Sequence, residues 1–555
     1  MSKPLTIREA IQATVPVLIL LGAYLVFLGR GELFEPDEVR YGEIAREMLE
    51  SGDYLTPHLN YVKYFEKPPL FYWVTAASMA FLGKGALALR LPVALLGLSG
   101  LLLVAGAARR REDPRSGGKT GFILASAPGY YLFSQVAVID LALTVFLTGA
   151  LLLFLPAATG EKRGKGGLCL AYLLLGLAVL TKGPVALVLA GAVIAIYAVV
   201  RRDRRALRRV LTVPGILIFA AITLPWFVAV SRANPEFPRY FFIHEHVSRF
   251  LAGEEIRSFH REPFWFFLPV LAGFFFPWIL LLPRVLTGLR RAPEKKKASL
   301  LFFTVWWLTV FVFFSISSGK LPSYILPCLP PLALSVALAG NGEGKSRPSA
   351  WFFNLSGTLL VLAGLGTVLY GSSAENARIS ASAAAVIGAA VAAGGTAFLI
   401  MARRGWHSLL GAATVLLAAE AVIIGQGRGE VAAARSTRLL AECALEISEG
   451  EGPFYSYNFY AQGMPYHTEK RIVLVDSHGE LRFGSTRGDQ GAWFISAEEF
   501  SGLARDEQRK TIVILRNRNE DRQAIEWISG GNLDVTAGSG EYLLVSNQPK
   551  KKGNR

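Results

Sequence analysis

The stretch GILIFAAITLPWFVAV (residues 215–230) contains no charged side chain, and neither do VPVLILLGAYLVFLG (15–29) and LCLAYLLLGLAVL (168–180). A helix needs roughly 20 mainly apolar residues to cross the hydrocarbon core of a membrane. Continuous apolar runs exclude a transmembrane barrel, whose strands alternate in polarity, so the spans are expected to be helices. Hydrophobic residues make up 52% of the 555-residue chain. The sequence therefore predicts a polytopic α-helical membrane protein.

Short basic clusters separate the apolar runs and predict the orientation of the chain. They lie at residues 109–111, 162–165, 201–209, 290–297 and 403–404. Cytoplasmic loops are enriched in Lys and Arg, so an N-terminus inside the cell places every cluster inside. The net charge of +16 is then explained by topology, and no nucleic-acid partner is expected. We expect about thirteen spans, at residues 12–29, 86–108, 119–136, 139–157, 167–181, 184–200, 210–230, 264–283, 299–318, 323–340, 352–371, 381–402 and 406–425.

The odd number of spans places the C-terminus outside, together with two long loops at residues 30–85 and 231–262. No small-residue cleavage motif follows the first run, so it is expected to remain as a span. The three cysteines form no disulfide or zinc-binding pattern. The membrane domain is predicted to cover residues 1–425 and a soluble α/β domain residues 426–555. In that tail, strand-like runs at 454–460, 471–477, 492–496, 511–515 and 541–546 alternate with helical stretches at 429–448, 497–509 and 519–528.

Charged residues that an apolar environment disfavours gather on the outer side of this topology. Glu35, Asp37, Glu38 and Arg40 follow the first span, where DEVRYGEIAREMLESG reads as a short helix. An acidic helix start also favours the helix dipole, which is the structural alternative to a functional role. Glu66 and Lys67 precede two prolines that fix the backbone, and a lysine that snorkels to the membrane surface is the alternative for Lys67.

Further along the chain, isolated polar residues interrupt apolar sequence on the same side. Asp140 in VAVIDLALTVF and Lys182 in LAVLTKGPVAL have little polar company, and an acid within a membrane usually faces a partner or a cavity. The turn GKLPSYILP carries Lys320 and Tyr324, although an interfacial aromatic belt also explains the tyrosine. His244 and His246 in FFIHEHVSRF are candidate metal ligands, but H-x-H alone is a weak signal.

The combined set suits sugar transfer from a polyprenyl phosphate at the outer membrane surface. The departing lipid phosphate needs cations, for which Arg40, Lys67 and Lys182 are candidates. The acceptor needs a carboxylate that orients or deprotonates it, for which the candidates are Asp37, Glu38 and Asp140. A transporter would be expected to show repeat symmetry and paired discontinuous helices. A structural scaffold would leave Asp140 and Lys182 unexplained.

These motifs resemble the bacterial 4-amino-4-deoxy-L-arabinose lipid A transferases, relatives of protein O-mannosyltransferases. The resemblance rests on the order of the acidic DE motif, EKPPL, the isolated Asp140, TKGP, FFIHEHVSRF followed by REPFWFFLPV, and KLPSYILP. It covers about residues 10–340 well and the rest only in layout. It implies the GT-C glycosyltransferase fold and inverting transfer from undecaprenyl phosphate to lipid A or another periplasmic acceptor. It also implies a monomer in the bacterial inner membrane, in contact with its lipids, with the active site and C-terminal domain in the periplasm.

The resemblance also implies roles for individual residues. Asp37 matches the principal acid and Asp140 the second acid, whereas Glu66 and His246 match a zinc site; no nucleotide cofactor is implied. A phosphate acceptor is already an anion and needs no base, so Asp37 then orients or balances charge. A hydroxyl acceptor makes Asp37 a candidate base, and the sequence leaves both roles open. The residues expected at the donor phosphate or substrate are Arg40, Tyr41, Lys67, Lys182, Arg249, Lys320 and Tyr324.

Overall fold

The computed structural model describes residues 7–111, 114–161, 165–248, 262–339, 350–373, 380–404 and 408–548. The chain divides into two compact units that do not follow its linear order. Unit 1 contains residues 1–28, 66–71 and 90–426, and unit 2 contains residues 29–65, 72–89 and 427–555. The domain boundary predicted between residues 425 and 426 is a division along the chain, and it stays a prediction.

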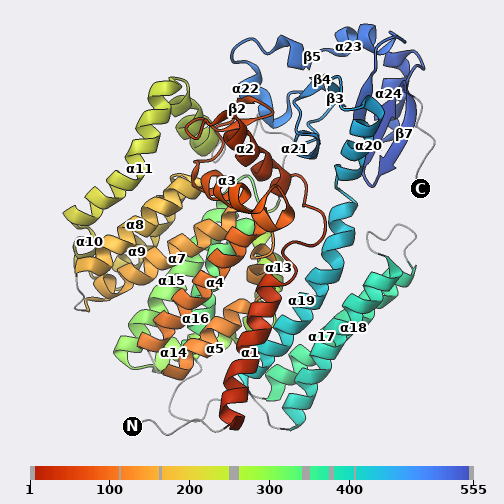
Figure 1. Cartoon of the computed structure of the whole chain (residues 1–555). Coiled ribbons are helices and arrows are strands. Elements are labelled where there is room, and N and C mark those ends of the chain that lie inside the picture. Colours follow the sequence, from red (N-terminus) through yellow and green to blue (C-terminus); the bar gives the residue numbers. More distant parts are fainter. Residues whose placement is uncertain are drawn as a thin grey trace. The chain divides into compact units, whose positions relative to one another are not determined.

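Unit 1 is a bundle of apolar helices (Figure 1). In the described part of the chain, eight helices are long and apolar enough to cross a membrane, and a ninth if one bent pair counts as a span. The helices that lie wholly or mostly in unit 1 are α1 (Ile7–Leu25), α4 (Ala86–Arg111), α5 (Pro114–Ala125), α6 (Pro128–Phe133), α7 (Ile139–Thr159), α8 (Lys165–Lys182), α9 (Val185–Val200), α10 (Arg205–Val210), α11 (Val213–Ala233), η1 (Arg239–Ser248), α13 (Phe267–Phe274), η2 (Trp278–Leu281), α14 (Leu282–Arg291), α15 (Glu294–Ile316), η3 (Pro322–Cys328), α16 (Leu329–Ala339), α17 (Ala350–Ser373), α18 (Ala381–Arg403) and α19 (Leu409–Ala433).

Two predicted spans differ from continuous helices. Residues 119–136 form α5 and α6 with a break before Pro128, because a proline cannot continue the hydrogen-bond ladder of the preceding helix. Residues 264–283 bend by 97° between α13 and the helix that begins at Trp278, next to Pro277. Helices α1, α8 and α9 contribute shorter apolar stretches, at Thr14–Leu25, Gly166–Lys182 and Val185–Val200. A polytopic helical architecture is confirmed, whereas the count of thirteen spans stays a prediction.

Unit 2 combines the first outer loop with the C-terminal tail. Helix α2 (Asp37–Ser51) ends at Gly52, whose left-handed φ of 71° is accessible to glycine, as the sequence predicts. Gly42 lies in close contact with Tyr466, where a Cβ atom would come within 2.7 Å of the tyrosine ring. The unit also holds the hairpin β1 (His58–Leu59) and β2 (Val62–Lys63), and most of α3 (Leu70–Leu82).

The tail forms a six-stranded sheet of order β5-β4-β3-β6-β8-β7. Strands β3 to β6 are parallel, and β8 pairs antiparallel with both β6 and β7. The sequence predicts five of these strands and misses β7, whose DVTAGS segment lacks an apolar run. The elements are α20 (Arg438–Ser448), β3 (Phe454–Tyr457), α21 (Gly463–Thr468), β4 (Ile472–Val475), η4 (Gly479–Leu481), α22 (Arg482–Ser485), η5 (Gly491–Trp493), β5 (Phe494–Ile495), α23 (Ala497–Ala504), β6 (Ile512–Arg516), α24 (Asn519–Ser529), β7 (Asp534–Ser539) and β8 (Tyr542–Ser546).

Candidate active site

The first group of candidate residues lies at the start of α2 in unit 2. Asp37 and Glu38 form its acidic first turn, where carboxylates favour the positive end of the helix dipole. Glu38 is fully buried, and its Oε2 accepts a hydrogen bond from the backbone N–H of Phe34 at 2.8 Å. This contact fixes the chain entering the helix, so it favours a structural role for Glu38. The Asp37 side chain is 47% exposed and accessible to a substrate.

Arg40 links this helix start to the C-terminal sheet domain within unit 2. Its guanidinium forms an ion pair with Asp37, and Nη1 donates to Glu480 Oε2 at 2.8 Å. The other oxygen of Glu480 accepts from Gln462 Nε2. Arg40 also lies over the ring of Tyr41, 5.3 Å from its centroid. Sequence reasoning misses Glu480, which lies 440 residues from Arg40 in an unremarkable HGEL segment.

A second contact that the sequence does not reveal fixes the segment before α2. The buried Glu35 carboxylate accepts hydrogen bonds from the backbone N and the hydroxyl of Thr437, at 2.6 and 2.8 Å. Burial raises the pKa of Glu35 to about 7, although the Thr437 hydrogen bonds act in the opposite direction. Glu35 therefore connects the first loop to the residue that precedes α20.

The second group of candidates lies in unit 1, where Asp140, Lys182 and Tyr324 come together. Helices α7 and α8 pack as a hairpin, so Asp140 at the start of α7 meets Lys182 at the end of α8. The two side chains form a buried ion pair. Lys182 Nζ also lies 4.2 Å from the centroid of the Tyr324 ring, carried by η3. Gly183 (φ 87°) turns the chain directly after the lysine.

The pairing of Asp140 with Lys182 changes the division of roles that the sequence suggests. Asp140, which the sequence assigns to the acceptor, and Lys182, which it assigns to the phosphate, form one ion pair. Each charge also complements the dipole of its own helix end. An ammonium group has three donors, so Lys182 retains hydrogen bonds for a phosphate oxygen while it holds Asp140.

Glu66 and Lys67 also belong to unit 1. Lys67 Nζ donates to the backbone oxygen of Glu66 at 2.9 Å and lies 4.0 Å from its Oε2. Lys320 is buried, and its Nζ donates to the backbone oxygens of Ser317 and Glu262 at 2.7 and 3.0 Å. These contacts close the turn before η3, which gives Lys320 a structural role besides the expected substrate contact.

The predicted zinc site is not assembled by the described residues. The side chain of His246 lies outside them, and so does Arg249, a predicted substrate contact. No group of three or more metal-ligating side chains occurs in the described part of the chain. His244 is exposed and stacks on Tyr240 with ring centroids 5.3 Å apart. Glu66, the remaining ligand candidate, has the Lys67 ammonium beside it. Zinc binding stays a prediction.

Family models match both parts of the chain. The model described as dolichyl-phosphate-mannose-protein mannosyltransferase matches residues 17–241, and the model of the aminoarabinose transferase C-terminal domain matches residues 443–524. Among solved structures, ArnT from Cupriavidus metallidurans bound to undecaprenyl phosphate aligns with a TM-score of 0.81 and 28% identity, covering 98% of this chain and 99% of that one. The Archaeoglobus fulgidus oligosaccharyltransferase shares the fold at a TM-score of 0.57 and 12% identity, over 97% of this chain and 74% of that one.

Curated relatives match over similar lengths. The undecaprenyl phosphate-α-4-amino-4-deoxy-L-arabinose arabinosyl transferase of Edwardsiella ictaluri (strain 93-146) is 31% identical over 96% of this chain and 98% of its own length. A transferase of the same name from Erwinia tasmaniensis is 31% identical over 91% of this chain and 93% of its own length. The chain belongs to the undecaprenyl phosphate-α-4-amino-4-deoxy-L-arabinose arabinosyl transferase family.

Proposed function

We propose that this chain transfers 4-amino-4-deoxy-L-arabinose, or a closely similar sugar, from undecaprenyl phosphate to lipid A. The reaction takes place on the periplasmic side of the bacterial inner membrane, with inversion at the transferred carbon. The observation that carries this proposal is the match over 96% of the chain to a relative named for the arabinosyl transfer. The structure of ArnT from Cupriavidus metallidurans bound to undecaprenyl phosphate aligns over 98% of the chain and supports the choice of donor.

The Asp140–Lys182–Tyr324 cluster supplies the chemistry that the departing phosphate needs. Negative charge develops on the phosphate as the sugar leaves, and a cation already fixed in place stabilises it without reorganisation. Lys182 is held by Asp140 and covered by the Tyr324 ring. Because the pair is buried, its field acts in a medium of lower dielectric than water. We assign Lys182 to the phosphate and Asp140 to positioning the lysine.

Asp37 and Arg40 supply a second charged pair for the sugar or acceptor. A lipid A phosphate attacks as an anion, so no base has to remove a proton. The Asp37 carboxylate, already engaged by Arg40, then orients the donor or holds its amino group. A hydroxyl acceptor would instead need Asp37 to act as a base.

A second candidate function is transfer of a polyprenyl-linked sugar to a protein or glycan. It is favoured by the match of residues 17–241 to the mannosyltransferase model. Both candidates place the same residues at the donor and differ in the acceptor.

The test uses the purified chain in detergent with radiolabelled undecaprenyl-phosphate aminoarabinose and three acceptors: lipid A, a protein and a glycan. We expect the label on lipid A, at a phosphate located by mass spectrometry. Label on the protein or glycan would favour the second candidate, and label recovered only in the donor would contradict both. The Asp37→Asn variant provides the inactive control.

A further inference from the structure

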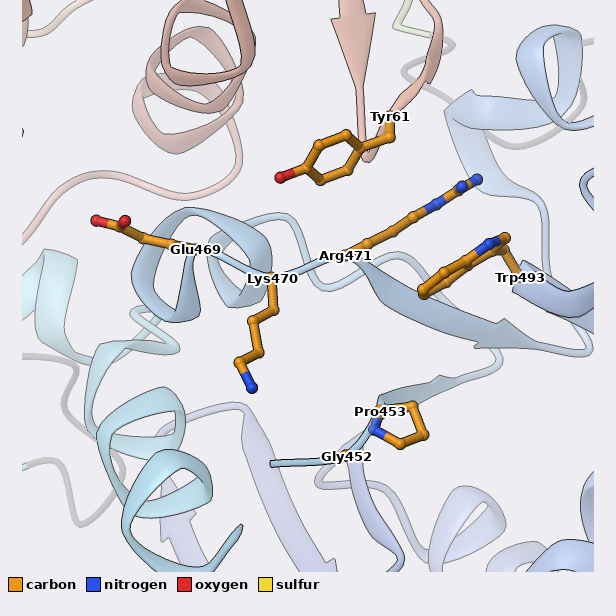
Figure 2. Close-up of a pocket in the computed structure, with 7 residues that line it drawn as sticks. All are labelled: Tyr61, Gly452, Pro453, Glu469, Lys470, Arg471 and Trp493. Atoms are coloured by element: carbon orange, nitrogen blue, oxygen red, sulfur yellow. The ribbon is translucent and has the colours of Figure 1, made fainter. Parts of the chain in front are cut away.

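An open surface pocket of about 500 Å³, called the cavity below, lies in unit 2, and no residue from the start of α2 lines it. Its volume is within the range of small-molecule sites. Figure 2 shows its lining, which consists of Tyr61, Gly452, Pro453, Glu469, Lys470, Arg471 and Trp493. The catalytic assignments above use none of these side chains.

The sheet topology explains why these residues meet. Pro453 directly precedes β3, Arg471 precedes β4 and Trp493 precedes β5. These three strands are parallel neighbours, so their amino ends lie at the same edge of the sheet. The cavity therefore lies at the edge formed by the amino ends of the strands. Ligands of open parallel sheets usually bind at the other edge, outside the carboxyl ends.

The hairpin of the first outer loop completes the cavity. Asn60 and Tyr61 form its two-residue turn, and both have positive φ, at 53° and 60°. The side chain of Asn60 exchanges two hydrogen bonds of 3.0 Å with the backbone of Ile472, the first residue of β4. This contact holds the hairpin at the strand end and brings the Tyr61 ring to the cavity. The position of Tyr61 is thus fixed by the buried contact between Asn60 and Ile472.

The lining carries positive charge without a fixed counter-ion. Neither Lys470 nor Arg471 forms an ion pair with a carboxylate among the described residues. Lys470 Nζ donates to the backbone oxygen of Gly450, and Arg471 donates to the neutral Gln490 side chain. The Glu469 carboxylate, which also lines the cavity, pairs with Lys84 Nζ at 2.7 Å. An anionic ligand would supply the missing partner.

Burial lowers the pKa of Arg471 to about 10, so the guanidinium remains charged at neutral pH while partly removed from water. Glu47 opposes this shift from within the protein. However, burial and Glu43 raise the pKa of the Glu47 carboxyl itself, which weakens it as a counter-ion. An anion that enters the cavity would therefore stabilise the half-buried Arg471 guanidinium more than Glu47 does.

Aromatic surfaces flank the cation. The Arg471 guanidinium carbon lies 4.3 Å from the centroid of the Trp493 ring. In Figure 2 the Arg471 side chain extends between Tyr61 and Trp493, while Lys470 leaves the chain in another direction. Planar aromatic faces pack against the apolar C–H face of a pyranose, and guanidinium and ammonium groups bind phosphate. The lining combines both kinds of contact.

We propose that this cavity binds a phosphorylated sugar, with the phosphate on Lys470 and Arg471, the sugar ring against Tyr61, and Trp493 holding the Arg471 guanidinium in place. As part of the proposed function, that ligand is the phosphorylated saccharide headgroup of the acceptor. Tyr61 also contacts Arg46 and Glu50 on α2. These residues lie nine to thirteen positions beyond Asp37, or roughly 14–20 Å along the helix. The cavity thus holds a part of the acceptor remote from the reacting phosphate.

The binding test uses the full-length protein in detergent and isothermal titration calorimetry. The probes are N-acetylglucosamine 1-phosphate, uncharged N-acetylglucosamine and inorganic phosphate. We expect the sugar phosphate to bind at least tenfold more tightly than either part alone. Lys470→Gln and Arg471→Gln should each weaken it about tenfold or more, because each removes a charge-assisted contact. Lys510→Gln is the matched control, since Lys510 is an exposed lysine of the same domain outside the cavity.

The kinetic test measures transfer from the donor to lipid A. In the two cavity variants the KM for lipid A should rise about tenfold, while the KM for the donor and kcat remain unchanged. If either variant fails to fold, Trp493→Leu replaces it, with a loss of sugar-phosphate binding as the expected result. Equal binding of inorganic phosphate and sugar phosphate would overturn the saccharide site, as would unchanged binding in every cavity variant.

The outcomes separate this inference from the proposed function. Sugar-phosphate binding that depends on Lys470 and Arg471, in a protein that does not modify lipid A, would support the cavity and contradict the function. Transfer to lipid A with an unchanged KM in the cavity variants would support the function and contradict the cavity.

Discussion

At the scale of single residues, the Asp140–Lys182 pair connects stability to chemistry. Both side chains are about nine-tenths buried, at 10% and 9% exposure. Removing one partner leaves the other as an uncompensated charge, which typically costs 3–5 kcal/mol. We expect Asp140→Asn and Lys182→Met each to lower the free energy of unfolding by about 3 kcal/mol. Thermal unfolding in detergent measures this change.

The double variant separates the two roles of the pair. Asp140→Asn combined with Lys182→Met leaves no buried charge, so most of the lost stability should return. Transfer activity should be lost in the double variant, because the departing phosphate no longer meets Lys182. A double variant no more stable than the single variants would contradict the pairing, and an active double variant would contradict the role of Lys182.

The sequence reveals some of these residues but not their partners. Asp140 and Lys182 stand out because each interrupts an apolar run. Their pairing depends on how α7 and α8 pack, which a linear pattern does not contain. The Arg40–Glu480 contact joins residues 440 positions apart, and nothing in the HGEL segment distinguishes Glu480 from a surface glutamate. Long-range contacts between polar residues carry no periodicity, so they remain invisible until the fold is known.

At the scale of elements, the C-terminal sheet domain holds the start of α2 through Glu480. A hydrogen bond to a charged group contributes about 1.5–3 kcal/mol, so Glu480→Gln should lower kcat/KM about 10- to 100-fold by misplacing Arg40. Glu498→Gln, an exposed carboxylate on α23, should have no effect. If Glu480 acts through Arg40, its substitution in an Arg40→Lys background should have a smaller effect. Equal losses in both backgrounds would contradict a positioning role.

The junction between Glu35 and Thr437 should respond to pH. The pKa of Glu35 rises from 4.5 to about 7 on folding, so the folded chain binds more protons than the unfolded chain between these values. The stabilisation is present below about pH 4.5 and is lost as the pH rises through about 7. The full effect is about 3 kcal/mol.

Thermal unfolding between pH 5 and 8 tests this junction. The wild-type melting temperature should fall with rising pH, and Glu35→Gln should flatten the profile. Glu498→Gln removes an exposed carboxylate that takes no part in the Glu35 shift, so it serves as the control that retains the slope. A slope that persists in Glu35→Gln would assign the pH dependence to other groups.

Elements with an apolar repeat follow the sequence prediction, whereas strand β7, which lacks an apolar run, does not. Helix α2 and strands β3, β4, β6 and β8 lie where the pattern places them. The polar face of α2 is nevertheless buried, with Glu43 and Arg46 in a bidentate ion pair. A polar residue satisfied inside the protein looks the same in sequence as one satisfied by water, so amphipathicity alone misplaces that face.

At the scale of the whole molecule, the basic loops predict which ends of the helices face the cytoplasm. Tyr54 and Glu498 are exposed outside the spans, and Arg204 is exposed in a basic loop. In a cysteine-free background, Tyr54→Cys and Glu498→Cys should react in intact spheroplasts with an impermeant thiol reagent. Arg204→Cys should react only after lysis. The opposite pattern would invert the proposed topology.

We propose that this chain modifies lipid A with a sugar from undecaprenyl phosphate by means of Asp37. The most direct measurement is mass spectrometry of lipid A from a deletion strain that carries either the wild-type chain or Asp37→Asn at equal membrane levels. We predict that the wild-type chain restores lipid A bearing one aminoarabinose and that the variant does not. Unmodified lipid A with the wild-type chain would contradict the proposed acceptor, and full modification with Asp37→Asn would contradict the role of Asp37.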